Sequence, residues 1–121
     1  MAAVTFSEEG IVLSGRAYEL LRFLTARDVG KPRARDVRPA NIRRGAIRHL
    51  VAVGDTVTST EELVQALDEL RQVGLLVARL GVPLRLGPVT IWRGGRQTYR
   101  LTDKGRRLGQ RELERPEQHR S

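Results

Sequence analysis

The segment spanning residues 58–105 constrains the fold of this chain more than any other, because helix signals and β-hairpin signals follow each other in it. Three leucines recur at i, i+4 and i+7, which places them on one stripe of a helix; they are Leu63, Leu67 and Leu70. Ser59 and Glu62 have the spacing of a capping box. Gly74 follows the periodic residues, where helices commonly end in a left-handed residue. The pattern predicts a helix over residues 59–73.

Two segments rich in β-forming residues come after this helix. Val89–Trp92 and Gln97–Leu101 flank Arg93-Gly94-Gly95-Arg96, and a pair of glycines between such segments is typical of a hairpin turn. We therefore predict a β-hairpin that turns at residues 93–96. Prolines at 83 and 88 confine the preceding insert to an edge strand or a loop.

Two motifs in this segment resemble the second half of a winged helix-turn-helix domain of the MarR and PadR regulator type. They are Leu67-Asp68-Glu69-Leu70-Arg71-Gln72-Val73-Gly74-Leu75-Leu76 and Tyr99-Arg100-Leu101-Thr102-Asp103-Lys104-Gly105. The resemblance implies an α+β fold with a three-helix core, a β-hairpin wing and a short C-terminal helix. It also implies that the wing arginines Arg93 and Arg96 lie along the sugar-phosphate backbone or enter the minor groove.

The remaining chain fits one domain over residues 14–115, after an extended lead-in at 1–13 and before a frayed tail at 116–121. Apolar periodicity and capping residues predict three further helices. The first starts at Ser14 or Gly15 and ends near residues 27–30. The second covers Ile42–Val53 and is capped by Asn41. The third covers Asp103–Glu114, is capped by Thr102 and ends before Pro116.

The net charge of +8 is distributed unevenly along the chain. Residues 31–48 hold seven basic side chains against Asp36, giving +6, and residues 79–107 hold eight against Asp103, giving +7. Residues 55–70 hold five acidic side chains and no basic one, giving −5. Two concentrated basic segments favour a polyanionic partner, and in the wing and helix positions predicted here they favour nucleic acid.

Two helices compete for the role of recognition helix. In one interpretation, a short helical turn at residues 33–37 precedes helix 41–53, and Arg43, Arg44, Arg48 and His49 read the major groove. In the other, helix 59–73 is the recognition helix, because a wing normally follows that helix directly. Two carboxylates, Glu61 and Glu62, at the start of helix 59–73 are unusual for a DNA-reading helix, although they suit the positive end of the helix dipole, and a glutamate can accept from a cytosine amino group.

Candidate DNA-binding residues come from all three segments. They are Arg43, Arg44, Arg48, Thr58, Ser59, Thr60, Gln65, Arg93, Arg96 and Arg100. Catalytic and metal sites are not expected, because the two histidines are far apart and no ligand spacing or phosphate-loop pattern occurs. No cofactor is expected. The chain has no cysteine and no apolar run of membrane-spanning length, so we expect a cytoplasmic protein that does not enter a membrane.

The sequence thus predicts a non-enzymatic, double-stranded DNA-binding domain. A small transcriptional regulator or a mobile-element control protein that acts by occupancy or recruitment fits best. The alternative is a winged-helix module that docks a protein in a larger assembly. The last helix is short and highly charged, which argues against a large dimer interface there, although a homodimer or a protein partner remains compatible with the sequence.

Overall fold

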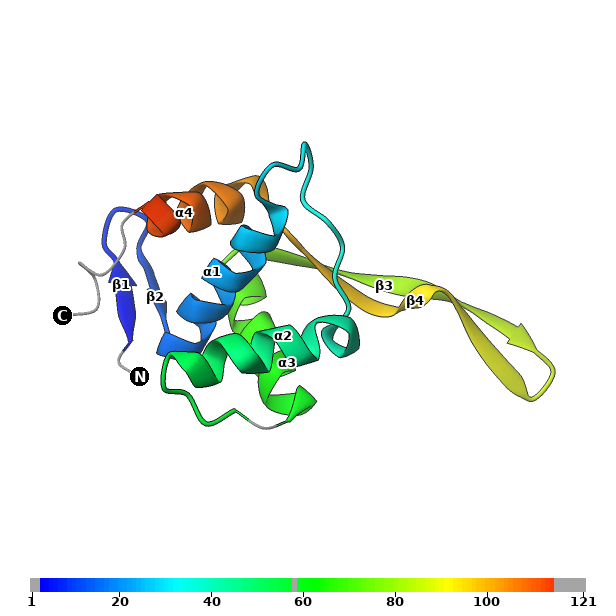
Figure 1. Ribbon diagram of the computed structural model, residues 1–121. Coiled ribbons are helices and arrows are strands. Elements are labelled where there is room, and N and C mark those ends of the chain that lie inside the picture. Colours follow the sequence, from blue (N-terminus) through cyan, green and yellow to red (C-terminus); the bar gives the residue numbers. More distant parts are fainter. Residues whose placement is uncertain (1–2, 58, 115–121) are drawn as a thin grey trace.

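A computed structural model describes residues 3–57 and 59–114 of the chain, with residues 80–83 and 92–96 described by their backbone alone. This part of the chain is an α+β domain of helices and two antiparallel hairpins (Figure 1). The elements are β1 (Val4–Phe6), β2 (Ile11–Leu13), α1 (Gly15–Asp28), α2 (Pro39–Ala52), α3 (Thr60–Gln72), β3 (Leu76–Leu86), β4 (Val89–Leu101) and α4 (Asp103–Glu114).

The helices surround an aliphatic core. Its fully buried side chains come mainly from α1 and α3, and they include Leu20, Leu21, Leu63, Leu67 and Leu70. The leucine stripe predicted for α3 therefore lies in the core, as the helical period requires. The predicted caps are also present: Ser14 Oγ accepts from the Ala17 N–H, and Thr102 Oγ1 accepts from the Gly105 N–H.

Residues 4–13, expected to be an extended lead-in, form the β1–β2 hairpin. Val4 pairs with Leu13 and Phe6 with Ile11. Phe6 is buried and its ring lies 6.1 Å from that of Tyr18 on α1. Glu9 at the turn forms a 2.8 Å ion pair with Arg111 of α4. The hairpin thus covers the end of the helical core opposite the long β3–β4 hairpin (Figure 1).

The second hairpin turns at a different place from the one predicted. Leu86 pairs with Val89, so the two-residue turn is Gly87-Pro88 and not residues 93–96, which lie within β4. Gly87 has φ 63, as the first central residue of a type II′ hairpin turn requires, and proline suits the negative φ of the next position. The Gly94-Gly95 pair instead faces an irregularity between Leu80 and Val82, a β-bulge position where glycine is common.

The helix that carries Arg43, Arg44 and Arg48 also differs from the prediction at its start. α2 begins at Pro39, with Arg38 as its N-cap, and not at Ile42 behind Asn41. Proline is favourable at the first helical position because its missing N–H would have no partner there. Residues 33–37, which form a short helical turn in one of the two interpretations above, are not helical. Val37 forms a β-bridge with Tyr99 instead, with N–H to carbonyl distances of 2.8 Å in both directions.

Candidate nucleic-acid interface

The outer face of α2 is an arginine face. Ile42, Ala46 and Leu50 are buried in the core, and the 3.6-residue period therefore turns the intervening positions outward. Arg43, Arg44 and Arg48 are all exposed. These three arginines therefore lie in solvent on the side of α2 that faces away from the core.

The linker between α1 and α2, residues 29–38, runs beside the base of the long hairpin. The Val37–Tyr99 bridge fixes this position, and Figure 1 shows the linker passing the base of the hairpin on its way into α2. Asp36 in the linker lies 3.9 Å from Arg79 of β3 and 4.0 Å from Arg100 of β4. All three side chains are substantially exposed, so these long ion pairs contribute little stability. They do show that charged side chains of the linker and of the hairpin lie next to each other on the surface.

Most arginines of this surface have no carboxylate partner. Within residues 3–57 and 59–114, no acidic side chain lies within 4.0 Å of the guanidinium groups of a set that spans the linker, α2 and β3. The set is Arg33, Arg35, Arg38, Arg43, Arg44, Arg48 and Arg85, all exposed. We call these residues, together with Arg79 and Arg100, the arginine surface. Unpaired guanidinium groups suit an external polyanion, since each can donate two parallel bonds to a phosphate.

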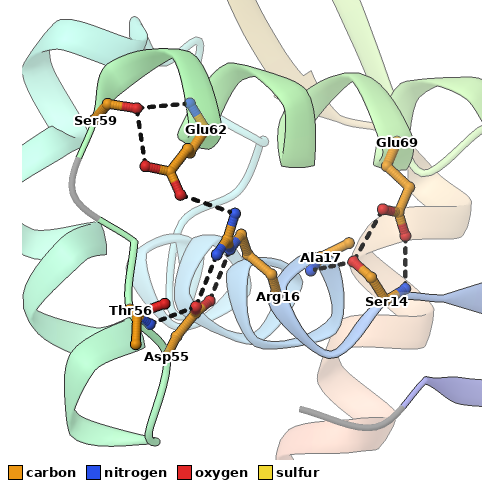
Figure 2. Close-up of polar contacts among 8 residues, drawn as sticks. All are labelled: Ser14, Arg16, Ala17, Asp55, Thr56, Ser59, Glu62 and Glu69. Carbon is orange, nitrogen blue, oxygen red and sulfur yellow. Dashed lines mark hydrogen bonds and ion pairs between the residues drawn. The ribbon is translucent and has the colours of Figure 1, made fainter.

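The start of α3 is occupied by an internal polar network, shown in Figure 2. Ser59 Oγ accepts from the Glu62 N–H at 3.2 Å and donates to Glu62 Oε1 at 3.1 Å. Glu62 Oε2 also lies 3.4 Å from Arg16 of α1. The Ser59 hydroxyl and the Glu62 carboxylate thus hold the first turn of α3 against α1. This explains one of the two carboxylates that looked misplaced on a DNA-reading helix.

Arg16 joins this network to the loop before α3. Its guanidinium donates to both carboxylate oxygens of Asp55 at 2.8 Å, and Asp55 also accepts from the Thr56 N–H. The hydrogen bonds from Arg16 hold the pKa of Asp55 below its usual value. A cavity of about 270 Å³ lies here between α1 and α3, lined by Asp55, Glu62 and Glu69 among others. Since Ser14 donates to Glu69 through both its N–H and its hydroxyl, all three carboxylates are used in joining α3 to the rest of the domain.

The solvent side of α3 carries two carboxylates, Glu61 and Asp68, and Asp68 lies 3.4 Å from Arg71 on the same helix. Glu61 and Gln65 are exposed, while Asp68 is half-buried and accepts from the Tyr99 hydroxyl at 3.0 Å. Burial and this hydrogen bond raise the pKa of Tyr99 to about 12. Tyr99 therefore ties the base of β4 both to α3 and, through the Val37 bridge, to the linker.

The structure brings some of the predicted site residues together and separates others. Arg43, Arg44, Arg48 and Arg100 belong to the arginine surface, whereas the Ser59 hydroxyl is used in capping α3. Gln65 is exposed at the margin of the cavity between α1 and α3. Thr60 is half-buried at the start of α3. Thr58 and the side chains of Arg93 and Arg96 lie outside the described residues.

Several residues of the arginine surface were not on the predicted list. Arg33, Arg35 and Arg38 were counted in the basic segment 31–48, and Arg79 and Arg85 in the basic segment 79–107, but none of them was assigned to the site. The charge of the segments was the available signal. The β-bridge between Val37 and Tyr99 brings the linker next to the hairpin. These two positions are so far apart in sequence that no periodic pattern indicates their pairing.

Comparison of the chain with protein-family models, with curated proteins and with solved structures found no match. None of the helices in the described ranges combines the length and apolar character needed to cross a bilayer. The same ranges contain no cluster of three or more histidine or acidic side chains arranged to hold a metal ion.

Proposed function

We propose that this chain is a winged-helix domain that binds double-stranded DNA. The element order supports it: three helices with a short bridging segment between the first two, then a hairpin directly after α3. In this interpretation the β3–β4 hairpin is the wing and α3 occupies the position of the recognition helix. The protein would act as a small transcriptional regulator or mobile-element control protein, by occupancy or recruitment.

The observation that carries the proposal is the arginine surface. It includes exposed arginines of the linker and of the outer face of α2, and Asp36 joins the linker to Arg79 and Arg100 of the hairpin. Few of these arginines have an acidic partner among the described residues. Phosphate contacts supply most of the affinity and the orientation of a DNA-binding protein, without reading sequence. We assign this role to Arg43, Arg44 and Arg48, with the linker and wing arginines extending the contact.

Base reading by α3 is restricted by its acidic outer face. Glu61 is exposed at the start of the helix, where it would either accept from a cytosine amino group or repel the phosphates beside it. Thr60 and Gln65 are the polar residues that remain for base contacts. We therefore expect affinity to come from α2 and the wing, and any sequence preference to be modest.

A panel of arginine variants tests the proposal. Arg43→Ala, Arg44→Ala and Arg48→Ala are each expected to weaken binding to every duplex by a similar factor, because phosphate contacts are independent of sequence. Arg107→Ala is the matched control, since Arg107 is an exposed arginine of α4 that is not part of the arginine surface as defined above. Fluorescence anisotropy with two unrelated labelled duplexes measures the effect. Equal loss in the control and the α2 variants, or no loss in any of them, would refute the assignment.

The acidic face of α3 favours a second candidate, a winged-helix module that docks a protein. In that case the exposed Glu61 would meet a basic partner, and duplex DNA would bind weakly or not at all near 100 mM salt. The same anisotropy measurements separate the candidates: a domain that binds no duplex at this salt, and whose Glu61→Gln variant is equally inactive, would favour the protein-docking module.

A further inference from the structure

The root of the β3–β4 hairpin has a third extended segment beside it. Tyr99 of β4 pairs with Ala78 of β3 on one side and with Val37 of the linker on the other. The side chains of all three lie toward the helices: Tyr99 is buried, and Val37 and Ala78 pack against the core. Because successive side chains of an extended segment alternate between its two faces, the neighbours of these three residues point to the opposite, outer face.

Charged residues occupy this outer face. They are Asp36 and Arg38 of the linker, Arg79 of β3 and Arg100 of β4. The Asp36 carboxylate lies 3.9 Å from the Arg79 guanidinium and 4.0 Å from that of Arg100, so cations from two strands converge on one anion. We call Arg38, Arg79 and Arg100 the root site.

Asp36 is the only acidic residue in the segments that carry the arginine surface. Residues 29–52 contain seven basic residues and residues 76–101 contain five, with no other carboxylate in either segment. Asp36 is not what holds the linker in place. The Val37–Tyr99 bridge does so with two backbone hydrogen bonds of 2.8 Å, whereas exposed ion pairs as long as those of Asp36 add little stability.

We propose that the root site binds a backbone phosphate of duplex DNA and that Asp36 occupies this site in the free protein. This inference rests on the proposed function. At 3.9 and 4.0 Å, Asp36 accepts no hydrogen bond from Arg79 or Arg100, so its pairing leaves N–H donors of both for another anion. A phosphate presents several oxygens and can accept charge-assisted bonds from both guanidinium groups at once.

The consequence is an internal competitor for DNA. A phosphate that enters the root site displaces the Asp36 carboxylate, because two anions cannot share the same guanidinium groups without repulsion. Since the bridge at Val37 holds the linker, Asp36 can leave the arginines while the linker keeps its position. Asp36 therefore lowers the affinity for every duplex to a similar extent, as an effect on phosphate contacts requires.

Asp36→Asn tests the competition, because it removes the charge and keeps the shape. Fluorescence anisotropy with two unrelated duplexes should show about fivefold tighter binding, the combined effect of two exposed ion pairs that no longer compete. The midpoint of urea unfolding should not shift. Glu114→Gln is the matched control: it removes the same charge from an exposed residue at the end of α4, which lies beside the β1–β2 hairpin and away from the root site (Figure 1). Its effect should stay below about twofold because salt screens distant charges.

Two variant backgrounds separate a local site from a general effect of charge. In Arg79→Gln/Arg100→Gln the gain from Asp36→Asn should disappear, because the groups for which Asp36 and the phosphate compete are absent. In Arg43→Ala, on α2, the full gain should persist, since independent contacts are additive. Arg79→Gln alone, an exposed position on β3, gives the same comparison with a smaller gain if the double variant is unstable.

The inference is overturned if Asp36→Asn binds duplex DNA no more tightly than wild type. It is also overturned if Glu114→Gln gives an equal gain, or if the gain persists in full without Arg79 and Arg100. In each of these cases the proposed function stands as long as the α2 arginine variants still weaken binding. If neither wild type nor Asp36→Asn binds a duplex, the proposed function fails, and this inference fails with it.

Discussion

Two helical glycines should respond to the same substitution with opposite sign. At Gly105, near the start of α4, an added Cβ would overlap the backbone carbonyl of Leu75. At Gly45, in the middle of α2, it would lie 3.2 Å from the edge of the Phe23 ring. A backbone carbonyl cannot move without disturbing the chain around it, whereas a half-buried ring can shift by a few tenths of an ångström.

The magnitudes follow from these contacts. Alanine in a helix interior is favoured over glycine by about 1 kcal/mol, and at Gly45 the ring contact offsets only part of this gain, so Gly45→Ala should stabilise by about 0.5 kcal/mol. Overpacking typically costs about 1–3 kcal/mol. At Gly105 the shift would also disturb the bonds from the Thr102 N–H to the Leu75 carbonyl, at 3.1 Å, and from the Gly105 N–H to Thr102, at 3.0 Å. Gly105→Ala should therefore destabilise by about 2 kcal/mol net.

Urea unfolding at 25 °C and low protein concentration measures the change in the free energy of unfolding for both variants. The slope of this free energy against urea concentration should stay constant if the folds are unchanged. The Gly105→Ala change corresponds to a lower melting temperature by about 8 °C for a domain of this size. A Gly105→Ala variant as stable as wild type would show that α4 does not approach Leu75 as described. A Gly45→Ala variant that loses more than about 1 kcal/mol would show that the Phe23 ring is fixed in place.

Three further substitutions test the polar contacts. Ser59→Ala should lose about 1 kcal/mol of stability in urea unfolding, because the α3 cap is removed; no loss would contradict the cap. Tyr99 has a raised pKa, so its contribution to stability is complete below pH 10 and is lost as the pH rises toward 12. Tyr99→Phe should therefore reduce the loss of unfolding free energy between these pH values. An unchanged loss would argue against the hydrogen bond from Tyr99 to Asp68. Arg16→Met should lower the free energy of unfolding by about 2 kcal/mol at neutral pH. It should also reduce the loss of stability in acid, because Asp55 then no longer has a lowered pKa. The same loss of stability in acid as in wild type would argue against the Arg16–Asp55 pair.

Local signals in the sequence predicted much of the fold. The leucine period and the Ser59 cap predicted α3 because both lie within a few turns of one helix, and Thr102 predicted the start of α4 for the same reason. The predicted position of the turn in the long hairpin was wrong. Both Gly87-Pro88 and Gly94-Gly95 contain glycine, and the pair of glycines at 94–95 is the stronger turn signal in the sequence. The Gly87-Pro88 turn gives an unbroken register from Leu86–Val89 to Val82–Arg93, which only the paired strands reveal.

The candidate site was predictable only in part. Helical periodicity alone turns Arg44 and Arg48 outward, and the charge count marked the linker as basic. The Val37–Tyr99 bridge, which places the linker beside the β3–β4 hairpin, joins distant positions and leaves no periodic signal. The same limit applies to Arg16, whose contacts with Asp55 and Glu62 depend on how α1 and α3 pack.

The central claim is that the arginine surface binds the phosphates of duplex DNA. The slope of log K against log salt concentration tests it most directly, since each neutralised phosphate contributes about −0.9. For about 5 phosphates the wild-type slope should be near −4.5, and the Arg43→Ala/Arg44→Ala/Arg48→Ala variant should retain a slope near −1.8, with Arg107→Ala as wild type. A wild-type affinity that does not change with salt, or a triple variant with the full wild-type slope, would contradict the account.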